Sequence, residues 1–384
     1  MIRNPFRFGR EVGGDQFYDR EVVYGRLRRI LANGSSNVVM YAPRRYGKTS
    51  LVKKVLAACN AEGEPTVYFD LNKVENIERF CEEYVTALCA LKGIGSELSQ
   101  KLLVYLSHLH PTIAMGGDSI VSVKFDYGGK MTANSVSAVL ECAEKVAVEL
   151  GEKSMVVAFD EFQEIGRLSG ELPLEGIFRS VIQAQQHVNY VFLGSQTHLL
   201  IRMFGDHSRP FYQSAATIRL EKPPDVESRE FVKRRFAVRN VGIDDETVSR
   251  IVEESENIPF YLQQLAYFVF EEVMASGRDW VEAVDVGNAI EELLGQQENY
   301  FEEKIAAFSA SQRMLISALA KEPTAEFTEA YRRRHSLGVP ATVHTAVKVL
   351  LEAGVAEREE KTYRIGDPFL SRYVRQSAVS RQTI

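Results

Sequence analysis

The sequence predicts an α/β fold in which a parallel sheet carries helices on both faces, followed by two smaller and mainly helical domains. Short apolar runs rich in β-branched residues alternate with helical patterns through the first part of the chain. Such alternation is typical of parallel strands that are connected by helices. The pattern changes after Lys222-Pro223-Pro224, where helical periodicity replaces the alternation. We therefore expect three domains, with the sheet in the first.

Five short apolar runs are the expected strands of the sheet. They are residues 38–41, 66–69, 155–159, 190–193 and 217–220. Residues 94–135 do not follow the pattern, apart from an alternating run at 120–125 next to Gly128-Gly129, and we treat this stretch as an insertion. The first domain is expected to cover residues 1–222.

The second and third domains are distinguished by their helical patterns. Four such patterns predict an all-helical second domain over residues 223–305, at 226–236, 244–254, 261–274 and 281–294. Three shorter ones, at 312–319, 327–335 and 340–353, precede a predicted hairpin at 355–365. Pro340 at a first helical position and Gly354 just past the helix end agree with the usual preferences. Three helices and a hairpin predict a winged-helix domain over residues 306–384.

The composition is that of a soluble globular protein. The chain is 45% hydrophobic and 26% charged, with a net charge of −6. No run of apolar residues is long enough for a membrane helix, and the first residues lack the apolar core of a signal peptide. None of the four cysteines belongs to a C-x-x-C pair, so zinc and thioredoxin-type sites have no support. We expect a cytoplasmic protein without a membrane partner.

A phosphate-binding loop follows the first predicted strand. The site requires amides at a helix amino terminus, a lysine for the β- and γ-phosphate oxygens, and a hydroxyl for Mg²⁺. Gly47, Lys48 and Thr49 meet these requirements, although Ala42 replaces the first glycine of the usual pattern. The predicted nucleotide-binding residues are Ala42, Pro43, Arg44, Arg45, Tyr46, Gly47, Lys48, Thr49 and Ser50.

Two carboxylates follow the apolar run at 155–159. Asp160 and Glu161 would lie at the carboxyl edge of the sheet, where ligands gather in such folds. Asp160 suits Mg²⁺ together with Thr49, and Glu161 stands where a base can polarise the attacking water. The sequence therefore predicts an ATPase with ATP and Mg²⁺ as cofactors. A nucleotide binder that never hydrolyses is disfavoured because Glu161 is present.

A third strand end could contribute to the same site. The run at 190–193 is followed by Gly194, Ser195 and Gln196. Ser195 could sense the γ-phosphate from the sheet edge, and the alternative is that it only helps to form a turn. Both interpretations remain open at this point.

The chain resembles the archaeal-type ATPase family, within the AAA+ and STAND P-loop ATPases, over most of its length. The resemblance depends on short segments that are spread along the chain: Asn4-Pro5-Phe6, Phe17-Tyr18-Asp19-Arg20-Glu21, Pro43 to Ser50, Phe159 to Glu164, Gly194-Ser195, Arg209-Pro210-Phe211-Tyr212, Ile258-Pro259-Phe260-Tyr261 and Asp367-Pro368-Phe369. It implies an AAA+-like sheet with the Ser195 strand between the other two site strands, then a helical lid and a carboxyl-terminal winged helix.

The resemblance also implies roles for residues outside the loop. Phe17, Arg20 and Pro259 would flank the adenine. Relatives often place an arginine just after the Phe-Tyr pair, where this chain has Gln213-Ser214, so Arg209 is the candidate for that arginine, which a homo-oligomer would supply to a neighbouring subunit. Asn257 stands where relatives usually have glycine, and asparagine tolerates a left-handed backbone.

Basic residues are concentrated at the carboxyl end. Residues 310–384 carry a net charge of +4, whereas the rest of the chain carries −10. Arginines close the second helix of the expected winged helix, and polar residues on the third lie away from its apolar stripe. This arrangement favours contacts to duplex DNA. The candidate DNA-binding residues are Arg332, Arg333, Arg334, Thr342, His344, Thr345 and Lys348.

Two functional classes fit these patterns. One is a DNA-associated ATPase whose nucleotide state sets its grip on DNA. The other is a STAND-like signalling switch whose winged helix docks a protein partner. Such switches usually carry sensor repeats or an effector domain, and this chain shows neither pattern, which favours the first class.

Overall fold

The structure is a computed structural model that describes residues 3–9, 20–34, 36–91, 94–116, 119–126, 131–151, 154–359 and 361–380. By its internal contacts the chain forms two compact units. The sheet unit comprises residues 20–42 and 48–220, and the helical unit comprises residues 1–19, 43–47 and 221–384. The three-domain division with boundaries after 222 and 305 stays a prediction.

The sheet unit contains a five-stranded parallel sheet in the order β2-β5-β6-β1-β7. The strands are β1 (Val38–Tyr41), β2 (Thr66–Asp70), β5 (Met155–Asp160), β6 (Val188–Gly194) and β7 (Ala216–Arg219). All five were predicted from sequence, within two residues at each end. β6 lies between β1 and β5, as the resemblance implies, and the α/β fold is confirmed.

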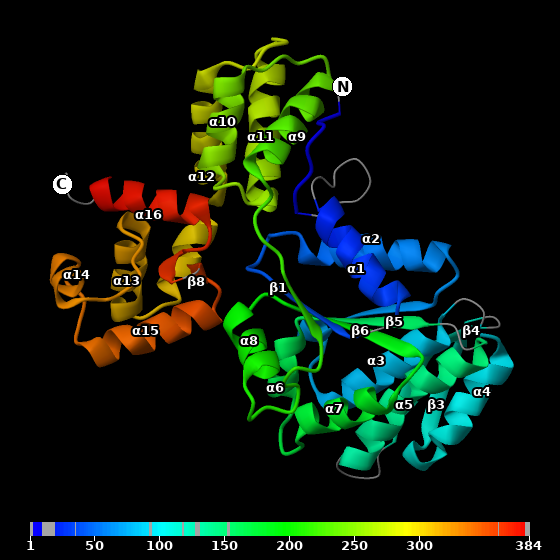
Figure 1. Ribbon diagram of the computed structural model, residues 1–384. Helices are drawn as coiled ribbons and strands as arrows, with labels where there is room; N and C mark the ends of the chain where they lie inside the picture. The colour runs from blue at the N-terminus through cyan, green and yellow to red at the C-terminus, as the bar shows by residue number, and fades with distance from the viewer. Residues whose placement is uncertain are drawn as a thin grey trace. The chain divides into compact units, whose positions relative to one another are not determined.

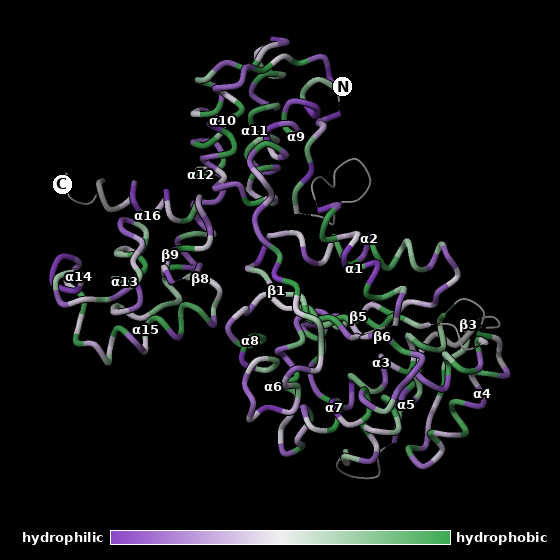
Figure 2. Tube along the Cα trace, viewed as in Figure 1, coloured by the Kyte–Doolittle hydropathy of each residue, from purple (hydrophilic) through white to green (hydrophobic). Residues whose placement is uncertain are grey.

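Helices cover both faces of this sheet, with α1 (Glu21–Ala32) and α2 (Lys48–Ala61) on one face in Figure 1. The opposite face carries α3 (Ile77–Cys89), α5 (Ala133–Glu149), α6 (Ile165–Leu168), α7 (Leu174–Ala184) and α8 (Thr197–Gly205). Every residue of β5 and β6 is buried, because both are central strands between two helical layers. Most of the residues of these two strands are apolar, and Figure 2 colours much of the sheet as hydrophobic.

Aromatic side chains fill the core directly beneath the carboxyl end of β5. The ring of Phe159 lies nearly parallel to those of Tyr190 and Phe192, with centroids 5.9 and 6.4 Å away. Phe162, just past the strand, contacts Phe192 at 4.5 Å. Such contacts fix the backbone on both sides of Asp160.

The stretch predicted as an insertion forms α4 (Ser96–Tyr105) and a hairpin of β3 (Pro111–Gly116) and β4 (Ser119–Phe125). The outer edge of β4 is covered by α3, since the amides of Val123 and Phe125 donate to Thr86 Oγ1 (2.9 Å) and Glu82 Oε1 (3.2 Å). The predicted strand at 120–125 is therefore confirmed. The adjacent Gly128-Gly129 lies outside the described residues.

The helical unit begins its main run with four helices. They are α9 (Asp225–Ala237), α10 (Asp245–Glu254), α11 (Pro259–Ala275) and α12 (Ala283–Ala306). The amino-terminal Asn4-Pro5-Phe6 segment packs on them, because Arg235 Nε donates to Pro5 O at 3.0 Å and the ring of Phe6 lies 4.9 Å from that of Phe236. This docking gives the segment a structural role.

The winged helix consists of α13 (Ala310–Lys321), α14 (Glu329–Arg334), α15 (Pro340–Glu352), the hairpin β8 (Ala356–Glu359) and β9 (Thr362–Ile365), and α16 (Pro368–Ser380). Thr324 bridges Tyr363, which extends the hairpin by a third short segment. The helices and hairpin were predicted, whereas α16 was not. None of the described helices combines the length and the hydrophobicity that a membrane crossing requires.

Candidate active site

The phosphate-binding loop joins β1 to α2. Gly47 has a φ of 89°, which glycine adopts without strain, and Lys48 begins the helix. The Lys48 side chain is buried, and its Nζ donates to Ala42 O at 2.7 Å. The lysine therefore folds back over the start of its own loop, where a phosphate oxygen could replace the carbonyl as acceptor.

Asp160 at the end of β5 is held from three sides. Its Oδ2 accepts from Thr49 Oγ1 at 2.7 Å and from Tyr68 OH at 2.5 Å, and its Oδ1 accepts from the Glu161 amide at 2.9 Å. Burial and the nearby Asp160 carboxylate raise the pKa of Tyr68, so its phenol remains a donor. The structure thus brings the two predicted Mg²⁺ ligands into direct contact.

Glu161 has a left-handed backbone, with φ of 50°, and its carboxylate turns toward the end of β6. Glu161 Oε2 accepts from the Ser195 amide at 3.1 Å, from Ser195 Oγ at 2.8 Å and from Gln163 Nε2 at 2.5 Å. A Cβ at the preceding Gly194 would lie 2.2 Å from Gln163 Oε1, so a larger residue there would displace the amide that binds Glu161. Ser195 is therefore placed to orient Glu161, while its predicted contact to a γ-phosphate stays a prediction.

The donor set fits Mg²⁺ and a nucleotide. Mg²⁺ prefers hard oxygen ligands and is usually held by one or two protein groups together with phosphates and water. The hydroxyl of Thr49 and the carboxylate of Asp160 are such ligands, 2.7 Å apart at the amino terminus of α2. A bound Mg²⁺ would supply charge neutralisation for the phosphate oxygens.

Two further candidates lie in the sheet unit but outside this cluster. Arg209 is paired with Glu175 of α7 through both Nη2 and Nε, the latter at 3.1 Å. Arg20 is buried at the start of α1. The roles predicted for both stay predictions.

Other candidates lie in the helical unit or beyond the description. Pro259 is the first residue of α11, where its missing amide costs nothing. Phe17 lies outside the described residues. Pro43, Arg44, Arg45 and Tyr46 group with the helical unit, whereas Ser50 lies in the first turn of α2.

The predicted DNA-binding residues lie on α14 and α15, and all of them except the half-buried Arg332 are exposed. Thr342, His344, Thr345 and Lys348 are exposed, opposite the buried stripe of Val343, Ala346, Val347 and Leu350. The arginines of α14 make local contacts: Arg332 Nε to Phe327 O (3.3 Å), Arg333 to Glu329 (2.5 Å) and Arg334 to Glu322 (2.7 Å). Lys348 lies 3.9 Å from Glu352.

Sequence reasoning missed two residues that hold the acidic pair. Tyr68 lies in β2, beside β5 and one register position before the Phe69–Phe159 pair, so only the strand order shows that it faces Asp160. Gln163 lies within the segment from Phe159 to Glu164, yet nothing in the sequence shows that its side-chain amide donates to Glu161.

Comparisons with known proteins agree with this arrangement. The family model described as "ATPase domain predominantly from Archaea" matches residues 17–265, and the one described as "Probable winged helix domain" matches residues 299–376. A comparison with curated proteins found no match.

Several solved structures share the fold. A Walker-type ATPase of Pyrococcus abyssi is 19% identical with a TM-score of 0.63, over 94% of this chain and 96% of that chain. The ORC2 protein of Aeropyrum pernix, in ADPNP-ADP complexes, is 15% identical with a TM-score of 0.51, over 95% of both chains. The ORC1 protein of Aeropyrum pernix, in complex with DNA, is 14% identical with a TM-score of 0.50, over 97% of this chain and 96% of that chain.

Proposed function

The chain belongs to the family of ATPase domains found predominantly in Archaea, and from this we propose that it is an ATP-hydrolysing molecular switch that acts on duplex DNA through its winged helix. In this proposal the nucleotide state of the sheet edge sets how firmly the winged helix holds DNA. The ATPase activity follows from the family, and the DNA role is the proposed part.

The proposed roles in hydrolysis follow from the contacts at the sheet edge. Lys48 binds the β- and γ-phosphate oxygens, and Thr49 and Asp160 hold Mg²⁺. Glu161 positions and polarises the attacking water, and Ser195 and Gln163 orient its carboxylate through hydrogen bonds to Oε2.

The observation that carries the DNA proposal is the exposed face of α15. A winged helix presents its third helix to the major groove, and here that face carries hydroxyls, an imidazole and a lysine. The arginines of α14 precede it and can reach phosphates. The ORC1 protein of similar fold was solved with DNA, which adds support.

One observation favours a second candidate, a signalling switch whose winged helix docks a protein. Arg333, Arg334 and Lys348 each have a carboxylate partner within the winged helix. These pairs cancel much of the positive potential that would attract DNA, because counterion release requires unpaired cations. The two candidates therefore differ in the salt dependence of binding that they predict.

The test is fluorescence anisotropy of a labelled duplex titrated with Glu161→Gln protein, with and without ATP and Mg²⁺, at several salt concentrations. We expect binding that needs ATP and falls steeply as salt rises. Lys348→Ala should weaken binding to all sequences and reduce the salt slope by about 1.

The matched control is Arg375→Ala, which removes one exposed cation from α16 rather than α15. It should leave the affinity for DNA and the salt slope unchanged. No binding at low salt, or equal losses in both variants, would reject the DNA role and make protein docking the leading explanation.

A further inference from the structure

Arg45 of the phosphate-binding loop is held by residues far along the chain. Its Nη1 lies 2.8 Å from Oδ2 of Asp367, the residue that precedes α16. The same Nη1 contacts the hydroxyl of Tyr261 on α11. The guanidinium lies over the rings of Phe260 and Tyr261, 4.7 Å from each centroid. The side chain of Arg45 thus connects the phosphate-binding loop to both α11 and the winged helix.

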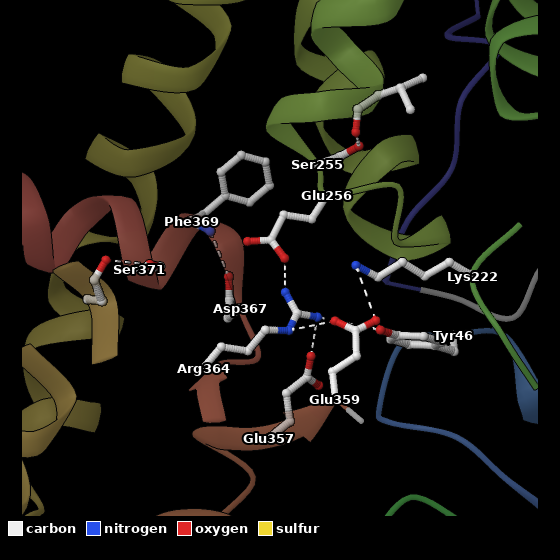
Figure 3. Close-up of polar contacts among 12 residues, drawn as sticks. Tyr46, Lys222, Ser255, Glu256, Glu357, Glu359, Arg364, Asp367, Phe369 and Ser371 are labelled. Atoms are coloured by element: carbon white, nitrogen blue, oxygen red, sulfur yellow. Dashed lines mark hydrogen bonds and ion pairs between the residues drawn. The ribbon is translucent and has the colours of Figure 1, made fainter. Parts of the chain in front are cut away.

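A second connection runs from Tyr46 to the wing. The Tyr46 side chain is buried, and its hydroxyl lies 3.5 Å from Nη2 of Arg364 on β9. Figure 3 shows Arg364 among three carboxylates, from Glu256 after α10 and from Glu357 and Glu359 on β8. The guanidinium of Arg364 therefore contacts the phosphate-binding loop, the turn after α10 and the β8–β9 hairpin.

Arg364 balances the negative charge of this cluster. Three carboxylates face it, and a second cation, Lys222, lies 3.7 Å from Glu359. Burial and the positive Arg364 lower the pKa of Lys222, which shows how closely the charges are packed. Loss of Arg364 would remove the cation that these three carboxylates share, so the guanidinium holds the hairpin of the winged helix to Glu256 and to Tyr46 of the loop.

Asp367 has two separate tasks. Its Oδ2 contacts Arg45, whereas its Oδ1 accepts from the amides of Phe369 and Leu370 at 3.0 and 3.2 Å and so caps α16. The two oxygens can be separated by substitution, because asparagine retains a capping oxygen and loses the charge.

We propose that Asp367 and Arg364 of the winged helix are positioning residues for the phosphate-binding loop and raise its affinity for nucleotide. Arg45 has a φ of 71°, a left-handed conformation that costs about 1 kcal/mol or more in a non-glycine residue and persists only when its surroundings hold it. The contacts of Arg45 and Tyr46 hold the loop in one conformation, which lowers the cost of ordering it on binding. Displacement of the winged helix therefore weakens nucleotide binding, and by reciprocity nucleotide binding strengthens this attachment.

The test measures binding of a fluorescent ADP analogue and steady-state hydrolysis for full-length Asp367→Asn, Arg45→Gln and the double variant. Asp367→Asn should weaken ADP binding about ten-fold, a typical coupling between two sites, and raise KM while kcat at saturating ATP stays the same. Asp367→Asn should have no further effect in the Arg45→Gln background, because the two side chains act through one contact.

The matched control is Arg372→Gln. It breaks another ion pair of α16, in which Arg372 Nη1 lies 2.6 Å from Glu254 of α10, without touching the loop. Melting temperatures of the variants separate misfolding from a specific effect. Wild-type affinity in Asp367→Asn, a loss equal to that of Arg372→Gln, or additive losses in the double variant would each overturn the proposal.

This inference is independent of the DNA proposal. Its measurements contain no DNA and no protein partner, so the winged helix can position the loop whichever partner it binds. A variant series that binds DNA normally and shows no coupling to ADP would reject the positioning role alone.

Discussion

At the scale of single residues, the carboxylate of Glu161 is held by several hydrogen bonds at the carboxyl edge of the sheet. Three donors from Ser195 and Gln163 reach its Oε2. A carboxylate held so firmly loses little entropy when it binds a water molecule, which is the requirement for a positioned base.

Glu161→Gln should keep nucleotide binding and lose about 10² to 10⁴-fold in hydrolysis, because the amide cannot accept the proton. ADP binding and phosphate release measured on the same preparation check both halves. Lys48→Ala is the reference for a variant that loses binding itself. Unchanged turnover in Glu161→Gln would remove the glutamate from this role.

The positions of the loop, Asp160 and Glu161 at the ends of strands could be predicted because a short run of neighbouring residues specifies each one. The roles of Tyr68 and Gln163 could not, because their importance depends on strand order and on a backbone turn at Glu161. The quoted Asp367-Pro368-Phe369 segment is a similar case. Its contact with Arg45 joins residues that no local pattern relates.

At the scale of elements, the turn between α10 and α11 depends on one buried asparagine. Asn257 has a φ of 55°, in agreement with the expectation that it replaces a glycine. Its Nδ2 donates to Pro223 O and Asp225 Oδ1, both at 2.7 Å, and its Oδ1 accepts from Ser228 Oγ at 2.6 Å. It therefore ties this turn to the start of α9, which glycine could not do.

Asn257→Ala should lower the free energy of unfolding by about 3 kcal/mol, because it leaves a buried carbonyl and hydroxyl unpaired and adds backbone strain. Urea denaturation followed by circular dichroism measures the change. Asn240→Ala is the matched control, since Asn240 is exposed and also has a positive φ of 57°. Equal losses at both positions would mean that the buried hydrogen bonds contribute nothing.

Element prediction worked where hydrophobic periodicity was strong and failed where packing decided the outcome. The sheet strands were found because they are short, apolar and separated by helices. α12 continues to Ala306, beyond the predicted end at 294. Its second half is mostly polar, so the hydrophobic periodicity is weak there, although Phe301 is buried. α16 escaped notice because its first turn is specified by the capping side chain of Asp367.

At the scale of the whole molecule, buried thiols make stability depend on alkaline pH. Burial raises the pKa of Cys59 to about 11 and of Cys89 to about 11, above the ordinary value of 9.0. A group whose pKa is raised by folding stabilises the folded state fully below its unfolded pKa. This contribution is lost as pH rises from 9 to 11, because the unfolded chain releases those protons first.

The free energy of unfolding should therefore fall between pH 8.5 and pH 10.5 by about 1 to 2 kcal/mol for each of these thiols. Urea titrations across this range measure the slope. The Cys59→Ala, Cys89→Ala double variant should show a flatter dependence, although its overall stability is lower. Identical slopes in the two proteins would show that these thiols do not titrate differently on folding.

The uninterrupted length of α12 has a mechanical consequence for the helical unit. Its 24 residues extend over about 36 Å, and the short turn to α13 is tied by a capping box between Ser309 and Gln312. If a helix of this length moves as a rigid body, a tilt of about 10° at its first turn displaces its last turn by about 6 Å. A small change beside α11 would thus arrive at the winged helix as a displacement larger than a side chain contact can absorb.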